Sequence, residues 1–390
     1  MNNELTEKAI NTLRFLSADG VQQANSGHPG LPMGTAAIAY TIWTKHMRFD
    51  PKNPDWADRD RFVLSGGHGS MLLYSLLHLT GFNVSLDDLK RFRQWGSITP
   101  GHPEYGFTPG VDATTGPLGQ GLSNGVGMAI AEAHLAAEFN QPEHKIVDHY
   151  TYGIVTDGDL MEGVASEAAS LAGHLKLGKI IYCYDDNRIS IDGPTIIAFT
   201  EDRAKRFEAY GWHVSFVEDG NNVDEIDKAI ITAKQDPRPS IIVCRTHIGY
   251  GLPNRQDTSK AHGEPPGDEE LNGAKVKLGW PTEPRFLIPD DVKALFEEAG
   301  KKGSEAHFAW NKSLTEYEKA FSAQGKEFQR RMAGKLPENW ADCLPVFAAD
   351  AKGVASRVAS GQTLNAIATA LPELMGGSAD LTPSNNTWLK

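Results

Sequence analysis

The chain has 390 residues, 40 % of them hydrophobic and 23 % charged, which is ordinary for a globular protein. Its 38 Lys and Arg against 50 Asp and Glu leave a formal net charge of −12, which argues against nucleic acid or an anionic membrane as a partner held by bulk charge. The sequence contains no apolar run of about 18 residues, so it predicts no membrane-spanning helix. Three cysteines without a CxxC pair (Cys183, Cys244 and Cys343) favour a reducing, cytoplasmic location.

The pattern of predicted elements changes near residue 150, from helices and loops to alternating strands and helices. Before it, apolar spacing predicts helices over residues 4–19, 33–47, 69–80 and 126–138, separated by Gly-rich and His-rich segments. After it, strands are expected at 154–156, 180–184, 213–217 and 240–245, with helices near 160–175, 201–210 and 223–235 between them. This alternation predicts an α/β fold, a parallel sheet flanked by helices, with ligands bound outside the carboxyl ends of the strands.

The rest of the chain divides into further segments. Residues 251–289 are rich in Gly and Pro and are expected to be mostly loops, and residues 290–334 read as charged helices. We expect one domain over residues 1–335, a linker over 336–350 and the incomplete start of a second α/β domain over 351–390. The last segment is expected to hold a helix near 354–370 and a strand at Glu373 to Met375. About 40 residues are too few for an independent core.

Polar side chains follow two neighbouring predicted strands. Asp157 and Gly158 follow the first strand, and Asn187 follows the second. The carboxyl ends of adjacent parallel strands meet at one edge of a sheet, so Asp157 and Asn187 are expected to lie close together. A carboxylate, a carboxamide and a backbone carbonyl suit Mg²⁺ or Ca²⁺. A single carboxylate leaves part of the dication's charge unbalanced, which predicts a second anion such as a diphosphate.

Each of these residues also has a simpler interpretation. Asp157 alone fits a helix cap and Asn187 alone fits a turn. The occurrence of both at two strand ends favours the metal site. A second segment, Gly116-Pro117-Leu118-Gly119-Gln120-Gly121, precedes an apolar helix, and its glycines fit either an anion site at a helix start or close helix packing.

Four histidines stand beside Gly or Pro in predicted loops. They are His28, His68, His102 and His262. Histidine donates to phosphate and sugar oxygens and moves protons near neutral pH, so the four together indicate a polar pocket for a sugar or a phosphate. Each one alone fits equally well a loop histidine bonded to a nearby carbonyl.

Taken in order, these motifs resemble those of transketolases, a family of thiamine-diphosphate enzymes. The pair of Asp157-Gly158 and Asn187 is shared by many thiamine-diphosphate enzymes. The segments Gly27-His28-Pro29-Gly30, Gly116 to Gly121 and Gly376-Gly377-Ser378-Ala379-Asp380-Leu381 are far more particular to transketolases. The resemblance runs over essentially the whole chain.

The resemblance implies roles for individual residues. Asp157, Asn187 and the backbone carbonyl of Ile189 would hold Mg²⁺ or Ca²⁺. The cofactor would be contacted by His68, Gly116, Pro117, Leu118, Gly158, Asn187 and His262. His28 and His262 would be the catalytic pair that handles sugar hydroxyls and protons. The sugar phosphate would contact His28, His102, His262, Arg357, Ser384 and Asp380, of which Arg357 and Ser384 would bind the phosphate.

The resemblance also implies an activity and an assembly. Transketolases use thiamine diphosphate and a divalent metal to transfer a two-carbon ketol unit from a ketose phosphate to an aldose phosphate in the pentose phosphate pathway. They form homodimers with the site between subunits. The family's cofactor-activating glutamate and its aromatic clamp lie beyond residue 390, so we expect the 390-residue chain to be a fragment that is inactive alone.

Two alternatives remain open from the sequence. A related two-carbon transferase, such as dihydroxyacetone synthase or deoxyxylulose-phosphate synthase, shares much of the pattern, although Arg357 and the segment from Ser378 to Ser384 favour transketolase. A chain that holds metal and diphosphate but turns over no substrate is the other alternative.

Overall fold

The computed structural model describes residues 3–350, 352–378 and 380–390. The chain forms two compact units, Met1–Lys312 and Ser313–Lys390, and the boundary falls within one long helix, α11 (Asp290–Ala320). The domain limits expected from the sequence, at residues 335 and 351, stay a prediction.

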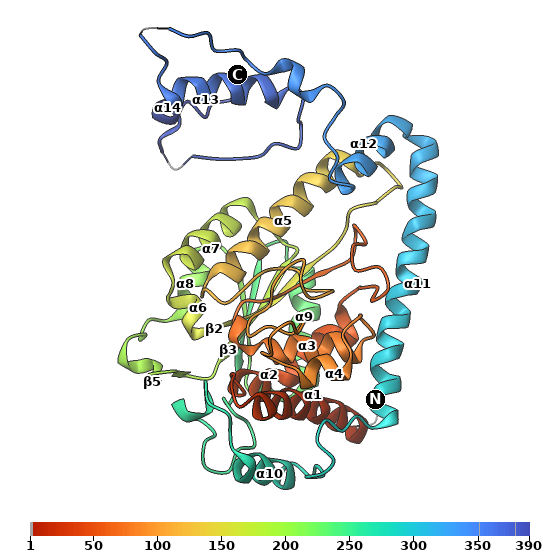
Figure 1. Cartoon of the computed structure of the whole chain (residues 1–390), viewed down its shortest axis with the longest axis vertical. Helices are drawn as coiled ribbons and strands as arrows, with labels where there is room; N and C mark the ends of the chain where they lie inside the picture. The colour runs from red at the N-terminus through yellow and green to blue at the C-terminus, as the bar shows by residue number, and fades with distance from the viewer. Residues whose placement is uncertain (1–2, 351, 379) are drawn as a thin grey trace. The chain divides into compact units, whose positions relative to one another are not determined.

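A five-stranded parallel sheet forms the centre of the first unit (Figure 1). The strands are β1 (Arg61–Leu64), β2 (Thr151–Thr156), β3 (Ile180–Asp186), β6 (His213–Val217) and β7 (Ser240–Arg245), in the order β1-β2-β3-β7-β6. A short antiparallel hairpin of β4 (Ile189–Ser190) and β5 (Gly193–Pro194) follows β3. The central strands β2 and β3 are buried along their whole length, which explains their nearly continuous apolar sequence.

Helices cover both faces of the sheet, so the predicted fold class is confirmed (Figure 1). One core contains side chains from α1 (Asn3–Ala24), α2 (Gly30–Thr41), α3 (Ser70–Leu79) and α9 (Val223–Gln235). The other contains side chains from α5 (Gln120–Phe139), α6 (Asp157–Met161), α7 (Gly163–Leu175) and α8 (Arg203–Ala209). Side chains alternate along a strand, so β3 contributes Ile181 and Cys183 to the first core and Tyr182 and Tyr184 to the second.

The remaining helices are α4 (Leu86–Lys90), α10 (Asp268–Lys277), α12 (Ser322–Met332), α13 (Ser356–Ala368) and α14 (Thr382–Asn385). None of the helices in the described part of the chain is long and apolar enough to cross a membrane. Strands β6 and β7 and helix α9 have the predicted limits. The sequence did not predict β1, and it predicted loops where α10 forms.

The strand expected at Glu373 to Met375 is wrong. Pro372 and Glu373 lie in a turn, and residues 374–378 have no regular structure. A strand needs a neighbour to bond its backbone groups, and the described residues of the second unit form helices but no strand that would supply one.

A buried ion pair ties the first helix to the segment after the sheet. Lys275 of α10 contacts Asp19 of α1 at 2.7 Å between Nζ and Oδ1, and each side chain is 1 % exposed. The other Asp19 oxygen accepts a hydrogen bond from the Phe286 N–H at 2.8 Å. Burial raises the pKa of Asp19, while the bonds from Lys275 and Phe286 lower it.

Replacing this lysine with an apolar side chain is expected to destabilise the first unit strongly. Lys275→Met would leave the Asp19 carboxylate buried without its cation, and the free energy of unfolding should fall by about 3–5 kcal/mol. Urea unfolding monitored by circular dichroism measures this. Lys8→Met is the matched control, because Lys8 and Asp291 form an exposed pair of nearly the same length; an equal loss in both variants would contradict the prediction.

Candidate functional site

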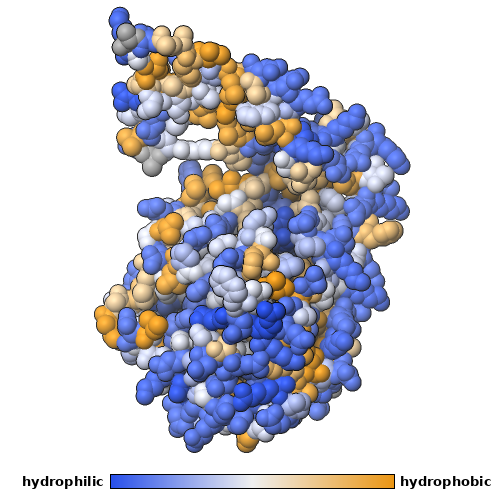
Figure 2. Space-filling model, viewed as in Figure 1, coloured by the Kyte–Doolittle hydropathy of each residue, from blue (hydrophilic) through white to orange (hydrophobic). Residues whose placement is uncertain are grey.

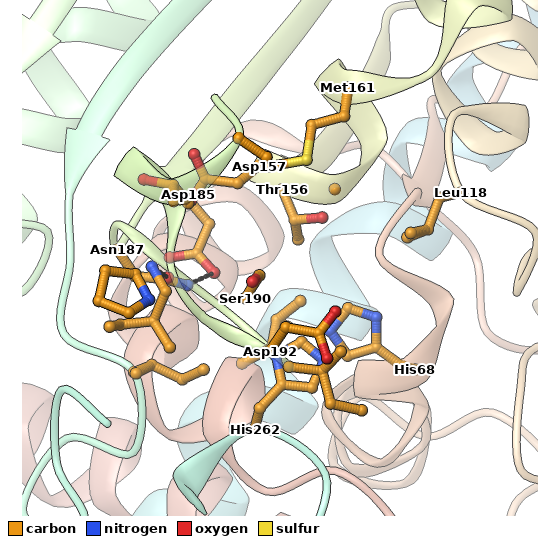
Figure 3. A pocket seen from close by; sticks show the side chains of 18 of the residues that line it. His68, Leu118, Thr156, Asp157, Met161, Asp185, Asn187, Ser190, Asp192 and His262 are labelled. Carbon is orange, nitrogen blue, oxygen red and sulfur yellow. Dashed lines mark hydrogen bonds between the residues drawn. The ribbon is translucent and has the colours of Figure 1, made fainter. Parts of the chain in front are cut away.

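The pairing of β2 and β3 places the two predicted metal ligands at one sheet edge. In the register of these strands Thr156 lies opposite Asp185. Asp157 is therefore the first residue after β2, and Asn187 follows β3 at the same edge. Both side chains are buried, and both line a cavity of about 340 Å³ (Figure 3).

The two carboxylate oxygens of Asp157 differ in their hydrogen bonding. Asp157 Oδ1 accepts a hydrogen bond from the Tyr184 hydroxyl, whereas Asp157 Oδ2 is buried and has no hydrogen-bond partner among the described residues. Burial raises the pKa of Asp157 to about 6. A buried carboxylate oxygen without a donor is costly unless a cation or another donor meets it.

Asn187 is held in place by its neighbours. Its Nδ2 donates to Asp185 Oδ2 at 2.9 Å, and its Oδ1 accepts from the Ile189 N–H at 2.9 Å. Asp185 is itself fully buried and accepts a hydrogen bond from the Thr246 hydroxyl, and burial raises its pKa to about 7. Asp185 therefore orients the carboxamide at the end of β3.

The residues fit a divalent metal with oxygen ligands. Within residues 3–350, 352–378 and 380–390 no group of three or more His, Cys, Asp or Glu side chains is arranged so that it could hold a metal ion. A metal here would accordingly depend on Asp157, the Asn187 carboxamide and a backbone carbonyl, a donor set that suits Mg²⁺ or Ca²⁺. The unpartnered Oδ2 of Asp157 is the observation that supports this fit.

Asp159 connects the loops around the cavity. Its side chain is completely buried, and its Oδ1 accepts from the Ser65 hydroxyl at 2.7 Å and from the Gly119 N–H at 2.8 Å. Its Oδ2 accepts from the N–H and the hydroxyl of Thr156, both at 2.9 Å. The sequence analysis gave Asp159 no role, although the spacing of Thr156 and Asp159 matches a helix capping box.

The Gly-rich segment lies beside this end of β2. A Cβ on Gly158 would come within 3.0 Å of Leu118, so residue 118 rests against the start of α6 and lines the cavity. Gly119 caps α5 with φ 76°, a left-handed conformation that glycine adopts without strain. Gly125 lies inside α5, where a Cβ would meet the Tyr182 hydroxyl at 2.0 Å, so this glycine serves close helix packing.

The four loop histidines come together. The ring centroids of His68 and His262 are 4.8 Å apart, and the centroid of His28 lies 5.1 Å and 5.6 Å from them. His102 follows at 6.4 Å from His28. Burial lowers the pKa of all four, so at neutral pH they are uncharged donors and acceptors.

Figure 3 shows His68 and His262 at the side of the cavity facing Asp192, away from Asp157. Gly116 lies next to His102, since a Cβ on Gly116 would be 3.2 Å from that ring. Pro117 is exposed and does not line the cavity. Ile191 and Ile197, from the segment around β5, also line it and are 62 % and 71 % exposed; apolar side chains gather at that edge in Figure 2.

His102 opens onto a second pocket. This pocket has a volume of about 720 Å³ and is lined by Arg93, Trp95, His102 and Glu104 among others. His28 lies between the two pockets, close to His262 of one and to His102 of the other. Bringing these loops together required the tertiary structure, because the four histidines are spread over more than half of the sequence.

Arg93 is a site residue that the sequence analysis missed. Its Nη1 donates to the Ser26 hydroxyl at 2.9 Å, and its Nη2 lies 3.5 Å from His28 Nδ1. A guanidinium has only donors, so Nδ1 of His28 must carry the lone pair and Nε2 the proton. Gly101 leaves room for this arrangement, because a Cβ there would stand 3.0 Å from Arg93 Nε.

Three predicted substrate residues belong to the second unit. Arg357 lies in α13, Ser384 in α14, and Asp380 just before α14. All three are exposed. Their part in a site together with the histidines stays a prediction.

Comparison with known proteins decides the family. Residues 5–337 match the family described as "Transketolase, thiamine diphosphate binding domain". The chain belongs to the transketolase family. It is 55 % identical over 390 residues to the transketolase of Halalkalibacterium halodurans and 55 % identical over 392 residues to that of Geobacillus stearothermophilus. In each case the match covers 100 % of this chain and 58 % of the relative, so the chain spans little more than half of their length.

Solved transketolases share the fold as well. A transketolase from Pichia stipitis in complex with a sedoheptulose 7-phosphate superimposes with a TM-score of 0.96 at 48 % identity, covering 99 % of this chain and 57 % of that one. The transketolase from Leishmania mexicana gives a TM-score of 0.95 at 50 % identity, with 98 % and 57 % covered. The expected family and its thiamine diphosphate binding domain are thereby confirmed.

The position of Arg93 predicts a change in the titration of His28. Burial, followed by the positive charges of His262, Arg93 and His102, lowers the pKa of His28 to about 4. Removing the positive charge in Arg93→Met should therefore raise the pKa of His28 toward its ordinary value, and the protonated ring should appear at a higher pH than in the original chain. Histidine NMR titration between pH 4 and 8 measures this.

The matched control is Arg91→Met. Arg91 is an exposed arginine two residues earlier whose Nη2 donates to the Trp95 carbonyl. A His28 pKa that is the same in Arg93→Met and Arg91→Met would show that the guanidinium does not act on the ring.

Proposed function

We propose that this chain is the cofactor-binding part of a transketolase, and that it binds thiamine diphosphate together with Mg²⁺ or Ca²⁺ in the cavity at the ends of β2 and β3. The supporting observation is the buried Asp157 Oδ2 without a hydrogen-bond partner, beside the carboxamide of Asn187. Asp157, Asn187 and the carbonyl of Ile189 would hold the metal. Gly158 and Asn187 would contact the diphosphate.

The charges at this edge support the pairing of a metal with a diphosphate. One Asp157 carboxylate cannot neutralise a dication, so a bound metal would attract a second anion into the cavity. Gly158 and Asn187 stand beside Asp157 along the cavity wall. Leu118, Ile189 and Ile191 supply an apolar lining on which the uncharged part of a cofactor would lie.

Thiamine diphosphate, when bound, supplies the electron sink for breaking a carbon–carbon bond next to a carbonyl group. The protein's part is to bind, orient and move protons. His28 carries its proton on Nε2 and, with His262, would donate to or accept from the sugar hydroxyls. His68 would contact the cofactor, and His102 would bind the sugar that enters through the 720 Å³ pocket.

Sugar phosphates are the proposed substrates, a ketose phosphate as donor and an aldose phosphate as acceptor. A solved transketolase at 48 % identity is described as a complex with a sedoheptulose 7-phosphate, which supports this class. Arg357 and Ser384 suit a phosphate group, since a guanidinium fork and a hydroxyl both donate to it. Asp380 is proposed to lie near the cofactor or the sugar.

A homodimer and a cytoplasmic location in the pentose phosphate pathway are likewise proposed for the full-length protein, on the basis of the family. A non-catalytic cofactor-binding chain is the second candidate. The chain spans 58 % of the length of its relatives, which is the specific observation that favours this candidate for the 390-residue polypeptide alone.

Binding of the cofactor tests the site directly. Calorimetry with thiamine diphosphate should show metal-dependent binding that EDTA abolishes. Asp157→Asn removes the charged metal ligand, so the affinity should fall by about tenfold or more. Asp192→Asn, a change of the same kind at an exposed residue of the same cavity, should have little effect. Equal affinities in the two variants would contradict the proposed site.

Turnover tests the reaction class. We expect the 390-residue chain alone to show no ketol transfer above the buffer background from xylulose 5-phosphate to ribose 5-phosphate. The full-length protein should transfer the unit between these two sugars and should not join glyceraldehyde 3-phosphate to pyruvate. A coupled assay of both reactions distinguishes a transketolase from a deoxyxylulose-phosphate synthase, and transfer by the 390-residue chain alone would rule out the non-catalytic candidate.

A further inference from the structure

A separate polar cavity lies between α1, α10 and the loop after β7. It has a volume of about 330 Å³ and is lined by Glu7, Asn11, Arg14, Asn221, Tyr250 and Lys277 among others. It shares no lining residue with the cavity that holds Asp157. Helices α1 and α10 are in contact, and Asn11 Nδ2 of α1 donates to the carbonyl of Leu278, the residue after α10, at 3.3 Å.

A buried arginine forms the base of this cavity. Arg14 is only 4 % exposed. Its Nε donates to the Met33 carbonyl at 3.0 Å, its Nη1 to Asn11 Oδ1 at 2.8 Å, and its Nη2 to Asn221 Oδ1. All three acceptors are neutral. These bonds use three of the five guanidinium N–H groups, so one on each terminal nitrogen remains for another acceptor.

No carboxylate among the described residues forms an ion pair with Arg14. Glu7 and Asp219 act on it only at longer range, and Asp219 Oδ1 is already bonded to the Asn221 N–H and side-chain amide. Burial lowers the pKa of Arg14 to about 10, which expresses the cost of its uncompensated charge. A buried cation without a counter-ion gains more from an incoming anion than an exposed one does, because less water screens the pair.

Two further side chains complete the surroundings. The ring of Tyr250 lies against the guanidinium, with Arg14 Cζ 4.6 Å from the ring centroid. Lys277 stands exposed on the cavity wall with no ion pair within the described part of the chain. Among the described residues that line the cavity, Glu7, also exposed, is the one carboxylate, so this lining carries two positive charges and one negative charge.

We propose that this cavity is a binding site for a small oxyanion, a phosphate group or a carboxylate, held by the free N–H groups of Arg14 and by Lys277. The oriented amides of Asn11 and Asn221 and the ring of Tyr250 hold the guanidinium in place before the anion arrives. The site lies behind the wall of the main cavity: Tyr250 is two residues from Ile248, which lines that cavity, and the Gly249 N–H between them donates to the Gly30 carbonyl at 3.0 Å. The proposal does not depend on the proposed function.

Inorganic phosphate is the probe that tests this site. At constant ionic strength, phosphate titrations followed by NMR of ¹⁵N-labelled arginine should shift the Arg14 Nε signal. Lys277→Gln should weaken binding by about two- to fivefold, as expected for an exposed charge. Arg14→Lys keeps the charge but loses the fork, and should weaken binding by about tenfold or more. Lys301→Gln, an exposed lysine of α11, should leave the affinity unchanged.

Two results would overturn the proposal. One is an affinity for phosphate that is the same in the original chain and in Lys277→Gln, a variant of an exposed residue that is expected to fold. The other is loss of phosphate binding when thiamine diphosphate and Mg²⁺ saturate the main cavity, because this would place the phosphate there. Failure of thiamine diphosphate to bind would count against the proposed function only, since the comparison of Lys277→Gln with the original chain still decides this site.

Discussion

The parallel register between β2 and β3 is the constraint on which the site depends. Because Thr156 pairs with Asp185, both strands end at the same level, and the residues after them face one cavity. A one-residue slip would turn Asp157 and Asn187 to opposite faces of the sheet. The register is held by side chains buried on both faces of β3, and by Asp159, which bonds the end of β2 to the loops that carry Ser65 and Gly119.

Two parts of the candidate site differ in charge, and burial causes the difference in both. At the proposed metal site, the buried Asp157 carboxylate retains an oxygen without a hydrogen-bond partner among the described residues, a cost that a cation would offset. Beside it, the four histidines lie close together, and burial lowers the pKa of each, so they are neutral at neutral pH. Among the histidines, Arg93 donates to His28 Nδ1 and so favours the proton on Nε2 of that ring. The proposed anionic cofactor and polyhydroxylated substrate would thus meet different electrostatic surroundings in neighbouring parts of the site.

Arg14 extends the same reasoning to a part of the fold outside the cofactor cavity. Its guanidinium is held by neutral acceptors and an aromatic ring, and two of its N–H groups remain available to another acceptor. The Asp19–Lys275 pair joins α1 and α10, the two helices that line the cavity around Arg14. Here each buried charge is compensated by the opposite charge, and the second Asp19 oxygen accepts a hydrogen bond from the Phe286 N–H. The buried charges of Asp19 and Lys275 compensate each other, so this pair is a structural contact. The buried charge of Arg14 has no such partner among the described residues, so Arg14 marks a candidate ligand site.

The sequence by itself determined the α/β class, the limits of β6, β7 and α9, and the residues that follow each strand, because apolar periodicity and strand-end chemistry are local properties. It also identified the family, through motifs whose residues are adjacent in the chain. The tertiary structure decided which residues become neighbours: β1 lies beside β2, the four histidine rings lie next to one another, Arg93 contacts His28, and Asp185 contacts Asn187. A strand at Glu373 to Met375 was wrong for the same reason, since a strand forms only where a neighbour accepts its hydrogen bonds and no local pattern records that neighbour.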